Sequence, residues 1–182
     1  MKRLIVVLGV LLFVFCSTAY ATPITFTDET LFSATGTDPS EDIVAYGYGD
    51  VNELNGKGDF IRWTHHFEFD PAAESILDGL LVLSLRDDND CFAEFGLALK
   101  EDGDWDFGGV DTGEYALDIN TEYLGDGAFT VTLVSLLGDF YIDKSALSVT
   151  YNPVPEPATL LLFGTGLAAF ATRKRIKLKK RQ

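Results

Sequence analysis

Hydrophobic and polar residues alternate along most of the chain, as they do in β-strands that bury one face. The segment IRWTHHFEF, from Ile61 to Phe69, alternates throughout and places Trp63, His65 and Phe67 on its apolar face. The run LLVLSLR that follows it is nearly all apolar, which is typical of a central strand. The chain between its two ends therefore has the pattern of a β-sheet protein.

Further segments alternate in the same way, and the residues expected to face the core are Cys91, Ala93, Phe95, Leu97, Leu99, Tyr115, Leu117, Ile119, Phe129, Val131 and Leu133. One segment differs: DPAAESILDG predicts a short helix, with Asp70 as N-cap and Pro71 at the first helical position. Short strands separated by Gly and Asp predict an all-β fold, a single jelly-roll-like β-sandwich.

The N-terminus predicts an export signal rather than a strand. Two basic residues precede an apolar run from Leu4 to Phe15, and a small-x-small cleavage site ends at Ala21. This order predicts a secretory signal peptide over residues 1–21, handled by the secretion machinery. The apolar run is too short for an ordinary membrane-spanning helix, which disfavours the alternative of an uncleaved anchor.

At the C-terminus, an uncharged apolar segment spans residues 158–172. The basic cluster behind it includes Arg173, Lys174, Arg175 and Lys177. A helix of this length is about 22 Å long, short of the roughly 30 Å hydrocarbon core, but long basic side chains help a short helix to span. Because basic clusters stay on the cytoplasmic side, we expect a transmembrane helix with its basic stop-transfer tail, residues 173–182, inside.

The stretch before this helix, from Val154, contains the triplet Pro155, Glu156 and Pro157. The triplet, the short apolar helix and the basic cluster, which together cover residues 154–182, resemble the PEP-CTERM sorting signal of Gram-negative bacteria. The resemblance implies cleavage near the triplet by an exosortase-type membrane protease. It also implies a transient membrane anchor, and then a place at the cell surface or in a biofilm matrix that contains exopolysaccharide.

Between the two ends lies one domain, residues 22–153. The stretches LSLRDDND, GEYALDI and GDFYIDKSALSV are similar, more loosely, to secreted β-sandwich domains that often precede this signal. The segment holds all 28 acidic residues of the chain except Glu156, against five basic residues, which gives a formal net charge of −22. This charge argues against nucleic acid and anionic membranes as partners and is compatible with cations and neutral polysaccharides.

An alternating acidic motif is the candidate metal site. Asp102, Asp104 and Asp106 have the spacing of the first three carboxylates of an EF-hand loop, but Phe107 stands where that loop has Gly and Glu114 falls one place late. Two interpretations stay open. The motif forms an irregular Ca²⁺ loop that relieves carboxylate repulsion, or it is a solvated acidic turn.

Catalytic motifs are scarce. His65 and His66 fall on opposite faces of a strand and cannot share one ion, so we expect His65 in the core and His66 exposed. Cys91 is the single cysteine of the domain, which argues for a buried apolar role over a nucleophile. No Gly-x-Ser-x-Gly, phosphate loop or dinucleotide fingerprint occurs in the sequence. We expect a non-catalytic structural or binding module; the alternative is an extracellular hydrolase with a carboxylate pair.

Exposed aromatic side chains are the candidate ligand platform, because large rings are enriched in binding hot spots. Trp105, between two aspartates of the acidic motif, is the expected platform for a sugar, and further candidates are Trp63, Tyr46, Tyr48 and Tyr141. The alternative is that the Trp105 ring folds back over the core.

Overall fold

The computed structural model describes residues 21–39, 43–47, 49–56, 58–87, 93–154, 163–164 and 166. The described elements, in chain order, are β1 (Ile24–Ser33), β2 (Gly36–Asp38), β3 (Val44–Tyr46), β4 (Glu53–Asn55), β5 (Phe60–His66), β6 (Ala73–Asp87), β7 (Phe95–Lys100), β8 (Gly103–Gly109), β9 (Gly113–Asp118), the 3-10 helix η1 (Thr121–Tyr123), β10 (Ala128–Leu137) and β11 (Asp139–Pro153).

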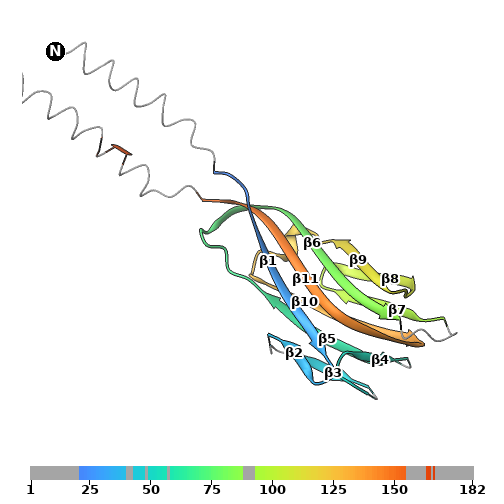
Figure 1. Cartoon of the computed structure of the whole chain (residues 1–182). Helices are drawn as coiled ribbons and strands as arrows, with labels where there is room; N and C mark the ends of the chain where they lie inside the picture. Colours follow the sequence, from blue (N-terminus) through green and yellow to red (C-terminus); the bar gives the residue numbers. More distant parts are fainter. Residues whose placement is uncertain are drawn as a thin grey trace, which may run out of the picture.

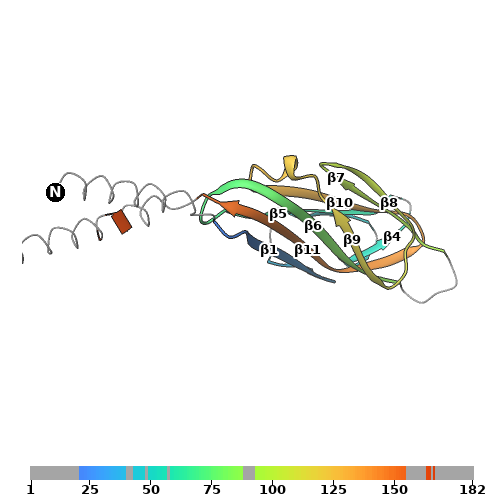
Figure 2. The same ribbon diagram turned by 90° about the horizontal axis from the view of Figure 1, so that it is seen from above.

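The strands form two antiparallel sheets that stack as a sandwich (Figures 1 and 2). Sheet A has the order β2-β1-β11-β6-β9, with β4 also paired to β11, and sheet B has the order β3-β5-β10-β7-β8. The predicted all-β sandwich is therefore confirmed, while its jelly-roll-like connectivity stays a prediction.

Most of the predicted terminal segments lie outside the described residues. This applies to the signal peptide up to residue 20, to the triplet at 155–157 and to the tail at 173–182, and only residues 163, 164 and 166 of the predicted helix are described. Within the described ranges, no helix has both the length and the apolar character needed to cross a membrane.

The core follows the predicted alternation in β5, β9 and β10. Trp63, Phe129, Val131 and Leu133 are essentially inaccessible to solvent, and Leu117 is almost so. These residues come from both sheets and form one cluster between them. The period-two pattern was sufficient here because each of these strands buries one face only.

Strand β7 has the opposite phase to the predicted one. Ala98 is fully buried and Gly96 faces the core, whereas Phe95 is 39% exposed and Leu97 lies half-buried on the outer face. A Cβ atom at Gly96 would lie 3.0 Å from the ring of Phe140 in the opposite sheet. The space opposite β7 is already filled by large side chains, so the small residues of the strand face inward.

The predicted helix at residues 70–79 is wrong. Residues from Ala73 onward belong to β6, which pairs with β11 from Ala73 through Asp87. The local helix preference is overridden because residues 73–78 pair with β11 as the first part of a fifteen-residue strand, which buries alternate residues from Gly79 to Leu85.

A single glycine joins the middle strands of the two sheets. Gly138 connects β10 in sheet B to β11 in sheet A and has a φ of 72°, in the left-handed region. A Cβ atom there would lie 2.7 Å from Cγ and 2.9 Å from Cα of Glu94. Both conditions require glycine, which allows the chain to cross between sheets without a loop.

A buried polar network also links the sheets. His65 of β5 lies 2.7 Å through Nδ1 from Asp28 of β1 and 2.8 Å through Nε2 from the hydroxyl of Ser145 in β11. The indole of Trp63 donates to the same Nε2 at 3.1 Å. Since indole N–H only donates, Nε2 must accept, and the proton lies on Nδ1 and points to Asp28. The predicted core position of His65 is confirmed, as is the exposure of His66.

Replacing His65 by Ala is expected to destabilise the fold by about 3 kcal/mol, because it opens a cavity and leaves the Trp63 and Ser145 donors buried without an acceptor. Urea unfolding of a fragment of residues 22–154 measures this change. The control His66→Ala alters an exposed position of the same strand and should stay within about 0.5 kcal/mol of the parent. Equal effects of the two substitutions would contradict a structural role for the network.

Candidate functional site

The end of the sandwich that leads to the predicted sorting signal is closed by paired backbone. Pro153, the last residue of β11, pairs with Ala73 of β6, and the amide of Val154 donates to the carbonyl of Ala72 at 2.7 Å. Strand β1 begins opposite Tyr151 of β11, so the described chain enters and leaves the domain at the same end (Figure 1).

An open cleft of about 600 Å³ lies at this end. Phe67 and Phe69 contribute apolar walls, and Glu68, Glu74 and Asp126 contribute acidic ones. A hydrolase with a carboxylate pair needs two such groups around a substrate, so the hydrolase alternative would place its site in this cleft.

The outer face of sheet B carries the second candidate site. The strand registers align two rows of outward side chains across the sheet, from β3 to β8. The first row consists of Tyr46, Phe60, Val134, Leu97 and Asp106, and the second consists of Val44, Arg62, Thr132, Leu99 and Asp104. We call these ten residues the outer face. They span four strand spacings, roughly 19 Å.

The outer face begins with an aromatic pair. Tyr46 is 69% exposed, and its ring stacks on that of Phe60 with centroids 5.9 Å apart and planes 21° apart. Beside this pair, Arg62 donates through Nε to the Thr132 hydroxyl at 2.9 Å, which leaves its terminal nitrogens on the surface. The face thus combines flat apolar rings with charged hydrogen-bonding groups.

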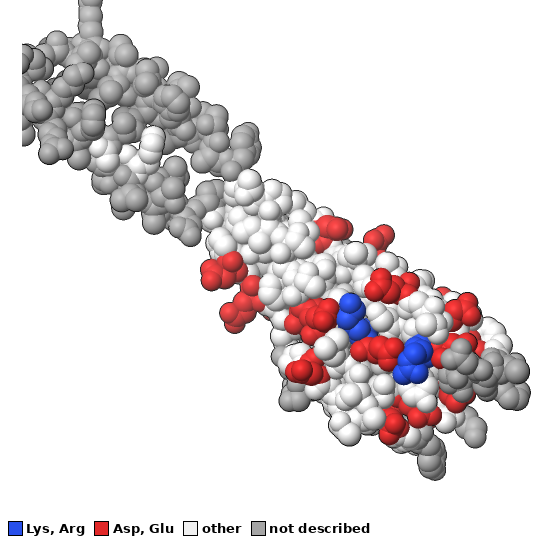
Figure 3. All heavy atoms as spheres, in the orientation of Figure 1, with Lys and Arg blue, Asp and Glu red and all other residues white. Residues whose placement is uncertain are grey.

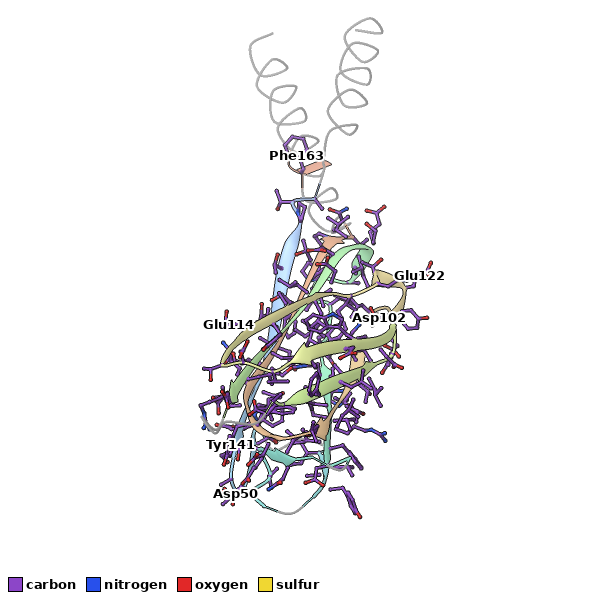
Figure 4. The ribbon with its side chains drawn as sticks, turned by 90° about the vertical axis from the view of Figure 1, so that its right-hand side faces the viewer. Asp50, Asp102, Glu114, Glu122, Tyr141 and Phe163 are labelled. Atoms are coloured by element: carbon purple, nitrogen blue, oxygen red, sulfur yellow. The ribbon has the colours of Figure 1, made fainter. Side chains whose placement is uncertain are left out.

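The structure separates the three aspartates of the predicted metal motif. Asp102 lies in the turn between β7 and β8, and its side chain is nearly buried. Its carboxylate accepts hydrogen bonds from Lys100 Nζ at 2.8 Å and from the Asn120 amide at 3.0 Å. Asp104 and Asp106 point out on the outer face instead. Figure 4 shows Asp102 in the half of the domain that carries Glu122, away from Asp50 and Tyr141.

In the described part of the chain, no group of three or more His, Cys, Asp or Glu residues is arranged to hold a metal ion. Calcium binding by the motif stays a prediction. An ion recruiting all three aspartates would have to draw Asp102 away from Lys100.

The structure turns Trp105 toward the core. It pairs with the buried Ala98 of β7 and packs on Phe107, with ring centroids 4.6 Å apart, and on Tyr115 at 6.3 Å. The aromatic residue that stands out from sheet B is Tyr46. Sequence reasoning did not select Phe60 or Arg62, although both lie on the polar face of the β5 alternation.

The network around His65 has the connectivity of a Ser-His-Asp triad, but its position argues against catalysis. Ser145 and His65 are completely buried, and the Trp63 indole occupies the nitrogen that would accept the serine proton. A substrate has no access to Ser145, so the network serves the packing of the two sheets.

The C-terminal residues were compared with known families. Residues 153–175 match the family model described as the PEP-CTERM protein-sorting motif. The chain carries a PEP-CTERM sorting signal. This confirms the resemblance inferred from the triplet and indicates an exported protein, a type found mainly in Gram-negative bacteria.

Distant likenesses exist among solved structures. They include a family two carbohydrate esterase from Cellvibrio japonicus (10% identity, 74% of this chain and 37% of that chain, TM-score 0.42). They also include the CBM36-1 domain of a multidomain xylanase from the hindgut metagenome of Trinervitermes trinervoides (20% identity, 68% of this chain and 96% of that chain, TM-score 0.35). A family 35 carbohydrate binding module from an environmental isolate is also similar, with 15% identity over 72% of this chain and 99% of that chain and a TM-score of 0.36. The chain thus spans about a third of the length of the esterase. No curated protein matches the chain.

In this PEP-CTERM chain the sorting motif follows the folded domain without a linker, because the match begins at the last residue of β11. The aromatic pair of the outer face lies toward the opposite end, where β3 is found (Figure 1). The start of the sorting motif and the aromatic pair therefore lie at different ends of the domain.

Replacing Asp102 by Ala is expected to destabilise the domain by about 3 kcal/mol, because the nearly buried Lys100 ammonium then loses the carboxylate that it is paired with. Urea unfolding of residues 22–154 measures the change. The exposed Asp104→Ala is the control and should stay within about 0.5 kcal/mol. A similar loss in both variants would contradict the ion-pair argument.

The parent domain and the Asp104→Ala variant also test whether the motif binds calcium. A rise in the unfolding midpoint on adding Ca²⁺ that disappears in Asp104→Ala would support the calcium prediction. An unchanged midpoint in the parent would reject it.

Proposed function

We propose that the protein is exported, is cut near Pro155, Glu156 and Pro157 by an exosortase-type membrane protease, and then displays its sandwich as a non-catalytic module that binds neutral polysaccharide. The module would lie at the cell surface or in the extracellular matrix. The PEP-CTERM motif supports the export step. The outer face of sheet B supports the binding step.

The observation that carries the binding proposal is the exposed stack of Tyr46 on Phe60 beside Arg62. A sugar ring presents an apolar face that packs on an aromatic ring, and its hydroxyls bond to charged donors and acceptors. Arg62 supplies donors, and Asp104 and Asp106 supply acceptors at the other end of the rows. The width of roughly 19 Å suits an oligosaccharide stretch of a polymer lying across the strands.

The acidic charge of the domain favours a neutral polymer over an anionic one as the ligand. Residues 22–153 hold 27 acidic and five basic residues. Figure 3 shows acidic side chains scattered over the face of the molecule seen in Figure 1, with the basic ones confined to the middle. Such a surface repels anionic polymers, so a neutral polysaccharide is the proposed ligand.

Deleting Pro155, Glu156 and Pro157 is expected to leave the protein unprocessed in the membrane, because the protease loses its recognition motif. Immunoblots of membrane and released fractions from a host with an exosortase measure this outcome. The control Thr159→Ala keeps the triplet and should be processed normally. Normal release of the deletion variant would reject the sorting proposal.

Replacing Tyr46 by Ala is expected to weaken retention on neutral polysaccharide by about tenfold, because a stacked aromatic anchor is lost. Affinity electrophoresis of residues 22–154 in gels containing a neutral glucan, mannan or xylan measures the change. The control Tyr123→Ala removes a tyrosine that is 42% exposed but lies on η1, away from the outer face.

Three outcomes of this experiment would count against the binding proposal. The parent shows no retention on any neutral polymer, or both tyrosine variants lose it equally. In the third outcome, reducing ends appear during incubation and vanish in Glu74→Gln, which would favour the hydrolase alternative.

A further inference from the structure

The folded domain reaches almost to the processing motif. Pro153 is buried and paired with Ala73, and the Val154 amide is bonded to the carbonyl of Ala72. Pro155, the first residue of the triplet, follows Val154 directly in the sequence. No residue between the sandwich and the triplet is therefore left to act as a spacer.

A protease holds its substrate as an extended segment, with several residues on each side of the bond that it cuts. For a cut near the triplet, the residues on the N-terminal side include Asn152, Pro153 and Val154. In the folded domain the Asn152 side chain is bonded to Ser75 at 3.2 Å, and the Pro153 ring is buried. These residues cannot fill an enzyme cleft while they remain in the sheet.

The end of the ladder is held more weakly than the rest of β11, because it is paired on one side only. Pairing with β1 stops at Tyr151, so Asn152 and Pro153 are paired with β6 alone among the described strands, and Val154 is bonded to Ala72, just before β6. The β6–β11 register also shifts twice here, between Thr150 and Tyr151 and between Asn152 and Pro153. Short, irregular pairing on one side only is typical of segments that open locally at low free energy.

The buried core starts at Tyr151, the residue of β11 that directly precedes Asn152. Tyr151 is 2% exposed and packs on Phe69 with ring centroids 4.7 Å apart. Opening beyond Tyr151 would therefore disrupt buried aromatic contacts, which limits the segment that can be released to residues 152–154.

We propose that the last rungs of β6 and β11, residues 72–75 with 152–154, form part of the processing site: the enzyme acts only after these rungs open. The inference rests on the proposed processing at the triplet. The pairing then sets the rate at which the membrane-held precursor is cut, and it re-forms after the cut to close the end of the mature domain.

A cross-link tests this directly. Ser75→Cys with Asn152→Cys, in the full-length chain with Cys91→Ser, places a disulfide across the rung that has to open. The matched control is Thr27→Cys with Ser148→Cys, a cross-strand pair whose hydroxyls are 2.9 Å apart and which joins β1 to β11 away from the end. A third protein adds a flexible linker of ten Gly and Ser residues after Val154 to the first cross-linked chain.

Processing is followed by pulse-chase in a host with an exosortase, and disulfide formation is checked on non-reducing gels. We expect the end cross-link to slow cutting by about tenfold or more, because it opposes local opening, while the control is cut at the parental rate. The linker should restore cutting in the cross-linked chain by moving the triplet away from the sandwich.

Cutting of the end-cross-linked chain at the rate of the control would overturn the inference, since the enzyme would then accept the closed end. Failure of the linker to restore cutting would also overturn it, because the cross-link would act by another route. A parent that is not cut at all would instead count against the proposed processing, and the two failures are distinguishable for that reason.

Discussion

The sandwich depends on one buried imidazole. His65 is bonded to two adjacent strands of the opposite sheet, to Asp28 of β1 and to Ser145 of β11, and its Nε2 also accepts from the indole of Trp63. An apolar core holds two sheets at a set distance but allows them to slide, whereas a network of fixed donors and acceptors specifies one alignment. In a domain whose single cysteine cannot form an internal disulfide, this network and the Gly138 crossing keep the two sheets in register.

Strand β11 transmits that alignment to both ends of the domain. It is the middle strand of sheet A and pairs with β1, β4 and β6. Its middle contributes Ser145 to the network, and its last residues close the end that leads to the sorting signal. The same strand therefore connects the packing of the core with the residues that directly precede the triplet of the sorting motif.

Local pattern predicted much of the fold but little of the candidate site. The alternation in β5, β9 and β10 identified the buried faces, because one side of each strand meets the core and the other meets water. It failed for β7, where Gly96 lies against Phe140, and for the start of β6, whose partner is more than seventy residues away in the sequence. Tyr46 reaches Phe60 and Arg62 only because β3 pairs with β5, which no local spacing encodes. Trp105 points inward because β8 pairs it with the buried Ala98 of β7.

Both described chain exits lie at one end of the domain, and the aromatic pair of the outer face lies away from that end. Strand β10 runs about 20 Å from Ala128 near the base to Val134 on the outer face, at a rise of roughly 3.3 Å per residue. That height exceeds the screening length of about 8 Å at physiological ionic strength. Under the proposed membrane-held precursor, Tyr46 and Arg62 would lie beyond the electrostatic reach of anionic lipids, and a polymer bound there would be sampled from solution rather than from the bilayer surface.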